Sequence, residues 1–294
     1  MRTSPKSEIR NPKGSGAFTM IEIAISLAII GFALVAILGI LPFGMGVQKD
    51  NRQETIINQD MTVWMNAIRN GERGLDDLTN YVIGITNVID AYNFRGVRTA
   101  RSTYGYGPLG SSVGNAPGNP QYPLTNGFRI IGLMSTPKMV TTYDQNGAPN
   151  GFLSNHVVAF VRAFSGPASE KAPQNNATVQ DLGLQYRLIS GVSAYGANFF
   201  DPTWTNYLAF PTNNPEYWVR SNYMTLVRTF QANWHEIRLN FRWPLLANGE
   251  ARPNSQVFRT MVGGSMTATN EYGFPAAPGY MLYYIQPRTY AKAP

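Results

Sequence analysis

The sequence predicts an α+β protein in which a long N-terminal helix packs on a C-terminal antiparallel β-sheet. An apolar run at 18–41 is followed by helical periodicity that continues to about residue 70. After residue 127 come short runs of β-branched and aromatic residues, separated by turn residues. The expected organisation is a short polar segment at 1–17, the helix at 18–70, a loop-rich connector at 71–126 and a β-rich domain at 127–294.

The apolar run has the length and composition of a membrane-spanning helix. Residues 18–41 are apolar apart from Glu22 and the small polar residues Thr19 and Ser26. The stretch 23–41 carries no charge, and its length is close to the ~20 residues that an α-helix needs to cross a bilayer core. Apolar side chains fall on all faces, which indicates lipid or complete burial rather than a surface helix. We therefore predict one membrane span.

The residues around this run suggest more than an anchor. Segment 1–17 has four basic residues and one acidic residue, which predicts that this end stays in the cytoplasm. A secretory signal has its small-residue cleavage site after the apolar run, whereas here the small residues at 14–17 precede it. Glu22 in hydrocarbon costs at least ~2.5 kcal/mol, so it needs a partner or a function.

The junction between the two segments consists of Gly16, Ala17, Phe18, Thr19, Met20, Ile21 and Glu22. It resembles the processing site of type IV prepilins and pseudopilins. In that family a prepilin peptidase cuts on the cytoplasmic side, the new N-terminal residue, usually Phe, is methylated, and the fifth mature residue is Glu. Alignment on Glu22 places the cleavage site between Ala17 and Phe18, with N-methylation at Phe18. The family normally has Gly before the cut, but a cut after Gly16 would make Glu22 the sixth residue.

The resemblance implies a structural subunit, a pseudopilin or minor pilin, of a type II secretion or type IV pilus-like filament. Segment 1–17 would be a cytoplasmic leader peptide, and the β-rich domain would lie outside a bacterial cytoplasmic membrane. The implied partners are other pilins or pseudopilins, prepilin peptidase, an inner-membrane assembly platform and the membrane. In the family, the residue that Glu22 matches pairs with the amino terminus of a neighbouring subunit, because two buried charges that cancel cost less than either alone. The chain has no cysteine, so it lacks the disulfide loop of many major pilins, which favours a pseudopilin.

The sequence offers little for catalysis or for metal binding. His156 and His235 have no cluster of carboxylates around them, and no HExxH, P-loop or GxSxG motif occurs. The stretch 144–147 has one carboxylate, which predicts a turn rather than a calcium site. We expect no enzymatic activity, no cofactor and no bound metal.

Net charge gives little support for a nucleic-acid partner. The net charge of +7 is supplied in part by segment 1–17, and no Lys/Arg-rich run follows. The stretch 95–106 combines three arginines with two tyrosines, as in a loop that binds single-stranded nucleic acid, but a solvated loop is the favoured interpretation. Two alternatives remain open: a signal-anchored extracytoplasmic binding domain that does not assemble, and a minor pilin for DNA uptake.

The helix is expected to weaken at 42–46, where Pro and Gly favour a kink or a melted turn. Its second half should pack on the sheet through a stripe of apolar side chains, with Asn58, Asp60, Asn66 and Arg69 off that stripe. The residues of the stripe are Ile57, Met61, Trp64, Met65 and Ile68. A short helix is expected within 75–89, followed by a long loop.

Seven strands are predicted after residue 127, with a hairpin turn at 231–234 between the fourth and the fifth. The fifth alternates apolar and polar residues, as a half-buried strand does. The predicted strands are 128–134, 156–164, 184–190, 223–230, 235–243, 256–262 and 280–286.

Overall fold

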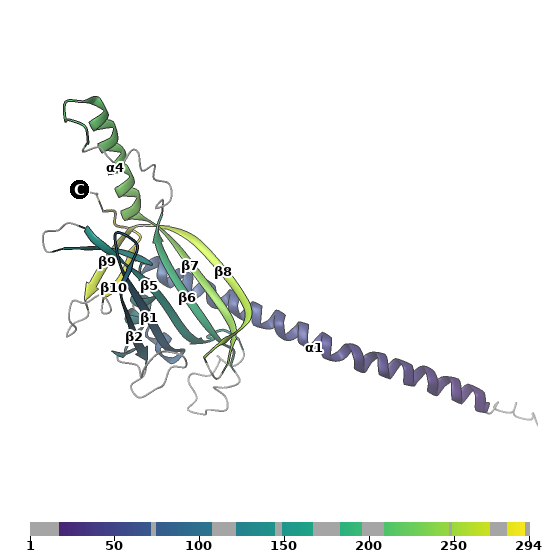
Figure 1. The fold of residues 1–294 in the computed structure, drawn as a ribbon. Coiled ribbons are helices and arrows are strands. Elements are labelled where there is room, and N and C mark those ends of the chain that lie inside the picture. The colour runs from purple at the N-terminus through teal and green to yellow at the C-terminus, as the bar shows by residue number, and fades with distance from the viewer. Residues whose placement is uncertain are drawn as a thin grey trace, which may run out of the picture. The chain divides into compact units, whose positions relative to one another are not determined.

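The structure is a computed structural model. It describes residues 18–71, 75–107, 122–144, 149–166, 183–195, 209–246, 249–270 and 281–291. The chain forms two compact units, Met1–Arg52 and Gln53–Pro294, and one helix, α1 (Met20–Asn70; Figure 1), contributes to both. The expected α+β class, with a long apolar helix at the N-terminal end and a β-sheet domain after it, is confirmed at this level. The leader at 1–17, with Gly16 and Ala17, lies outside the described residues.

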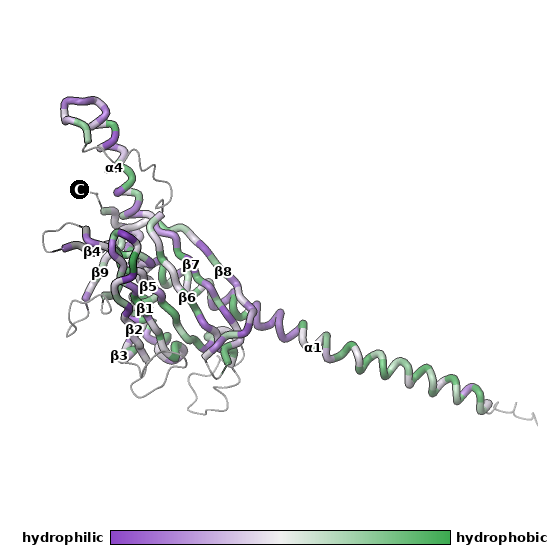
Figure 2. Tube along the Cα trace, in the orientation of Figure 1, coloured by the Kyte–Doolittle hydropathy of each residue, from purple (hydrophilic) through white to green (hydrophobic). Residues whose placement is uncertain are grey.

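The first unit contains the apolar part of α1. Every residue from 18 to 50 is exposed, and Figure 2 shows that most of this part of the helix is hydrophobic (green). It is the one described helix that is long and apolar enough to cross a membrane. The helix is continuous through Pro42 and the glycines that follow, so the expected melted turn is wrong. Proline removes a single backbone donor, and α1 has hydrogen-bonded turns on both sides of it.

The second unit is built on an eight-stranded sheet with the order β3-β2-β1-β5-β6-β7-β8, and β4 pairs with β5. The pairs are antiparallel except for β2 with β3, which are parallel. A separate hairpin is formed by β9 (Ser265–Asn270) and β10 (Met281–Gln286). The strands of the main sheet are β1 (Val82–Asn93), β2 (Arg98–Gly107), β3 (Tyr122–Pro123), β4 (Met139–Tyr143), β5 (Pro149–Arg162), β6 (Gln185–Ala194), β7 (Trp234–Leu245) and β8 (Ala251–Gly263).

The second half of α1 fills the core of this unit. Trp64 is completely buried, its indole Nε1 donates to the Tyr186 hydroxyl at 2.9 Å, and its ring lies 6.1 Å from that of Phe164. Ile57 and Ile68 are also buried, and Met61 and Met65 are half-buried against the same cluster, which confirms the predicted stripe. Asp60 was expected off the stripe, but it is completely buried.

Two predicted strands are helices. The run 128–134 belongs to α2 (Gly127–Met134), which the Asn126 side chain caps by accepting from the Arg129 backbone N–H at 2.8 Å. All eight residues of α2 are buried except Phe128, which is half-buried. Burial on all sides removes the polar positions that distinguish a helix from a strand, so a short apolar run fits both.

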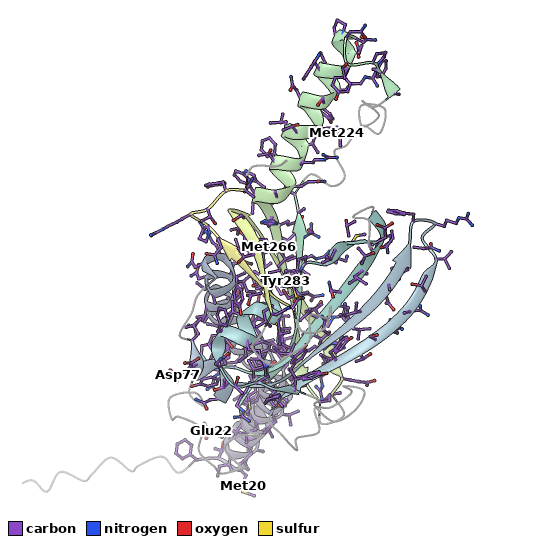
Figure 3. All side chains as sticks on the ribbon, turned by 90° about the vertical axis from the view of Figure 1, so that its left-hand side faces the viewer. Met20, Glu22, Asp77, Met224, Met266 and Tyr283 are labelled. Atoms are coloured by element: carbon purple, nitrogen blue, oxygen red, sulfur yellow. The ribbon has the colours of Figure 1, made fainter. Side chains whose placement is uncertain are left out.

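The second is the run 223–230, which belongs to α4 (Pro215–Asn233). The Asn214 side chain accepts from the Glu216 backbone N–H at 2.9 Å, and Pro215 occupies the first turn, as helix starts favour. The helix continues to Asn233 and leads directly into β7, so the predicted hairpin at 231–234 is wrong. Asn233 is the one buried residue of α4, and the side chains of the helix extend outward around most of its length (Figure 3).

Strands β1 and β2 lie where a short helix and a long loop were expected. The helical part is limited to a short 3₁₀ turn, η1 (Asp76–Asn80). Asp90 on β1 holds two arginines of β2, with Oδ1 at 3.6 Å from Arg98 and 3.0 Å from Arg101. The expected solvated loop is wrong for β2, because these arginines have a cross-strand carboxylate partner that the local sequence does not reveal. Residues 108–121 of the expected loop lie outside the described residues.

Trp64→Ala is expected to lower the free energy of unfolding of a fragment from residue 53 to residue 294 by about 3–5 kcal/mol, because it removes a buried aromatic side chain. Val63→Ala is the matched control, since Val63 is exposed on the same helix and should cost less than ~0.5 kcal/mol. Denaturant unfolding followed by circular dichroism measures both. Equal, small effects of the two substitutions would contradict the packing of α1 in this core.

Candidate functional site

The candidate site is the N-terminal end of α1, where the predicted processing motif meets the helix. Thr19 precedes the first helical residue, and its backbone N–H and hydroxyl donate to Glu22 Oε2 at 2.8 and 2.9 Å. The Glu22 backbone N–H in turn approaches Thr19 Oγ1 at 3.4 Å. This reciprocal arrangement is a capping box, which satisfies backbone donors that an N-terminal helical turn leaves free.

The structure thus brings together Thr19, Met20, Ile21 and Glu22 of the predicted motif, and Figure 3 places Met20 and Glu22 at the same end of α1. Phe18 and Met20 are exposed, at 81% and 87% of their surface. Ser26 also donates to the Glu22 carbonyl oxygen at 2.7 Å. Glu22 therefore has a partner within its own helix. The sequence carries the signal for this role, since Thr19 and Glu22 have the spacing of a capping box.

The second unit contains a buried carboxylate, Asp60, whose burial was not predicted from the sequence. Asp60 accepts from the backbone N–H groups of Phe164 and Ser165 at 3.2 and 3.0 Å, and from the Ser165 hydroxyl. These contacts attach the chain after β5 to α1. The signal was available in the spacing, because Asp60 follows Ile57 by three residues and precedes Trp64 by four, which places it on the buried face.

Burial raises the pKa of the Asp60 carboxyl to about 6, and its hydrogen bonds to Ser165, Tyr186 and Phe164 oppose that rise. Desolvation dominates because these partners are neutral and provide no full positive charge. The Tyr186 hydroxyl lies between Asp60 and Trp64, and its own pKa is raised by burial and by the Asp60 charge. This cluster links α1 to β6, and we assign it a structural role.

The two histidines are separate. His156 was expected at the start of a strand, but it lies well inside β5 and is exposed. His235 lies near the start of β7 as expected and is 5% exposed. Burial lowers the pKa of His235, although carbonyl groups of Gly264 and Ala232 partly compensate. The two side chains lie on different strands and on opposite faces of the sheet, so they do not form a shared catalytic or metal site.

The remaining sequence candidates are the possible metal ligands and the arginine and tyrosine stretch. No group of three or more His, Asp or Glu side chains is close enough to hold a metal ion there. Most of the expected turn at 144–147 lies outside the described residues. In the arginine and tyrosine stretch of β2, Tyr106 is buried in the core, so its ring is not available for base stacking.

Comparisons with protein family models, with characterised proteins and with solved structures each found no match for this chain.

The pH dependence of stability is expected to report on Asp60. Its pKa is about 6 in the folded chain against 3.8 for an unperturbed carboxyl, so the folded state prefers the protonated form. The resulting stabilisation is fully present below pH 3.8 and is lost as the pH rises to about 6, with a magnitude of up to roughly 3 kcal/mol. Asp60→Asn keeps an acceptor oxygen without the charge, so this pH dependence should disappear.

The measurement is the free energy of unfolding between pH 4 and pH 7, within the range set by these pKa values. Asp77→Asn, at an exposed carboxylate of η1, is the control and should retain the slope of the unsubstituted chain. If Asp60→Asn retains that slope as well, Asp60 is not the titrating group.

Proposed function

We propose that this chain is a structural subunit, a pseudopilin or minor pilin, of a type II secretion or type IV pilus-like filament. It is inserted in the cytoplasmic membrane by α1, cut by prepilin peptidase between Ala17 and Phe18, and methylated at Phe18. The observation that carries the proposal is the position of Glu22, the one charge within the apolar run and the fifth residue from Phe18.

The exposed surface of α1 supports the proposal. All large apolar side chains from Phe18 to Val47 are exposed, so water would meet apolar surface on every face of the helix. Such a surface is stable when it is covered by lipid or by the helices of other subunits, and a filament subunit would be covered by lipid before assembly and by other helices after it. The same helix continues into the core of the second unit, where Trp64 and Ile68 are buried. A filament subunit requires this combination of an assembling segment and a folded domain.

The hydrogen bonds of Glu22 suggest how assembly would use its charge. In the isolated chain, neutral groups of Thr19 donate to the carboxylate. Cleavage before Phe18 creates a positively charged amino group, and its pairing with the Glu22 of a neighbouring subunit would add an attraction between opposite full charges that the neutral donors of Thr19 cannot supply. Since each charge is costly in hydrocarbon without its partner, subunits in the wrong stagger would be penalised.

The second candidate function is a signal-anchored binding domain that does not assemble. The capping box favours it, because Thr19 satisfies the Glu22 carboxylate without a neighbouring subunit. The two functions differ in what they require of Glu22. An anchor needs an acceptor for the cap, whereas a filament subunit needs the negative charge.

Processing is tested by the mass of the N-terminal peptide. In cells that contain an active prepilin peptidase, membrane-extracted protein should begin at N-methylated Phe18. Ala17→Gly should be cut at least as well, because it restores the residue that the family has before the cut. A chain that still begins at Met1 in such cells would contradict the proposal, and a start at Ala17 would move the cut by one residue.

Assembly is tested by two substitutions that separate capping from charge. Glu22→Gln keeps an oxygen acceptor that suits a capping box but has no charge. It should be inserted and cut normally and should be lost from sheared filament fractions. Thr19→Val, the control, removes the hydroxyl donor but keeps the Glu22 charge, and should still assemble. Normal assembly of Glu22→Gln would support the anchored-domain alternative instead.

A further inference from the structure

The face of the main sheet opposite the core carries a hollow centred on Gly191. Along β7, Ile237, Leu239 and Phe241 point into the core, and the alternate residues point to this opposite face. The hollow has a volume of ≈ 480 Å³, which lies within the range of small-molecule sites. Its lining includes Lys138, His156, Gly191, Glu236, Arg238 and Arg259.

The strand register explains how these side chains meet. Gly191 on β6 pairs with Arg238 on β7, and Arg238 pairs with Arg259 on β8. On the other side of β6, Val157 pairs with Ser190, which places His156 opposite Gly191. One row across β5, β6, β7 and β8 therefore consists of His156, Gly191, Arg238 and Arg259. Gly191 is the one position in this row without a side chain. The hollow lies where the side chain is missing.

The backbone conformation at position 191 does not require a glycine. Its φ angle is not positive, and a Cβ added there would meet nothing closer than the Arg238 carbonyl oxygen at 3.9 Å, an ordinary contact. Glycine within a strand weakens it and often marks a place where a ligand approaches closely. The fold would accept a side chain at this position, so the absence of one keeps the hollow open.

The charges around the hollow favour an anion. Lys138, Arg238 and Arg259 are exposed cations, and the carboxylate of the lining, Glu236, lies 3.9 Å from the Arg259 Nε. Like charges directly opposite each other on neighbouring strands destabilise a sheet. This holds for Arg238 with Arg259 and again for Arg187 with Arg242. An oxyanion bound between these groups would relieve the repulsion and could accept several charge-assisted hydrogen bonds.

We propose that the hollow over Gly191 binds a small molecule through a phosphate or carboxylate group, held by Lys138, His156 and Arg238. This site does not depend on the proposed filament function, because it rests on unit Gln53–Pro294 alone. No local sequence pattern predicts it, since Lys138, His156, Arg238 and Arg259 come from four separate segments of the chain.

The pKa of the His156 imidazole can report whether an anion is bound in the hollow. Its pKa is lowered by partial burial and by the positive charges of Arg187, Lys138 and Arg101, and the Asp90 carboxylate opposes that effect. Glu236, Arg238 and Arg259 face the same hollow. A bound oxyanion favours the charged imidazole and therefore raises the pKa of His156. The chain contains two histidines, and buried His235 lies on the core face, so its resonance is an internal control for folding.

The experiment follows the two histidine resonances by NMR in the full chain, held in detergent micelles and labelled with ¹³C-histidine. The pH is varied in inorganic phosphate, in acetate and in chloride at equal ionic strength. We expect a higher His156 pKa in phosphate or in acetate than in chloride, with His235 unaffected. The stronger of the two responses identifies the charged group that the site prefers.

Three variants test the geometry. Arg238→Gln should weaken binding of the probe anion about tenfold. Gly191→Val should fill the hollow and abolish the response while the His235 resonance stays in place. Arg95→Gln, at an exposed arginine in the β1–β2 turn, should bind as the unsubstituted chain does. Equal titration of His156 in all three salts would overturn the proposal, and so would an unchanged response in folded Gly191→Val.

Discussion

The packing of α1 on the main sheet depends on a few polar contacts inside an apolar interface. Trp64 donates to the Tyr186 hydroxyl, and Asp60 accepts from Phe164 and Ser165 in the chain after β5. Apolar contacts alone would tolerate small shifts of a helix along a sheet. A shift of one turn would leave these buried groups without partners, and each such group costs about 1–3 kcal/mol. The polar contacts therefore determine the register of the helix, and the apolar side chains supply most of the stabilisation.

The sequence predicted the elements whose periodicity is local and missed those determined by distant contacts. Strand β7 was predicted because one face of the sheet is core and the other is solvent, so its residues alternate. Helix α2 was not, because it is buried on all sides by elements distant in sequence, such as β10. Asp60 shows the limit most clearly, since its charge suggested solvent although its spacing placed it on the buried stripe. The hollow over Gly191 requires strand pairings that no local pattern contains.

At the N-terminal end of α1, Glu22 has a local role in capping the helix, and the proposed filament function would give it an intermolecular role that competes with the first. Glu22 caps its own helix through Thr19, and capping contributes typically ~1 kcal/mol. Pairing with a full positive charge of a neighbouring subunit would add Coulomb attraction that increases as the dielectric falls, and it would avoid leaving either charge in hydrocarbon without a partner. An isolated chain would thus keep the cap, and assembly would exchange it for the stronger partner. The capping box is compatible with either function, and the negative charge is what distinguishes them.

The two faces of the main sheet have different chemistry, and this separates stability from recognition. The core face is occupied by α1 and α2, with side chains such as Trp64 and Ile131 buried against it. Substitutions there act mainly on folding. The opposite face carries paired arginines whose repulsion lowers stability, and a glycine in place of a side chain that the backbone would accept. Because folding alone gives no reason for either feature, both support the anion site proposed on the opposite face, which involves residues of the second unit alone.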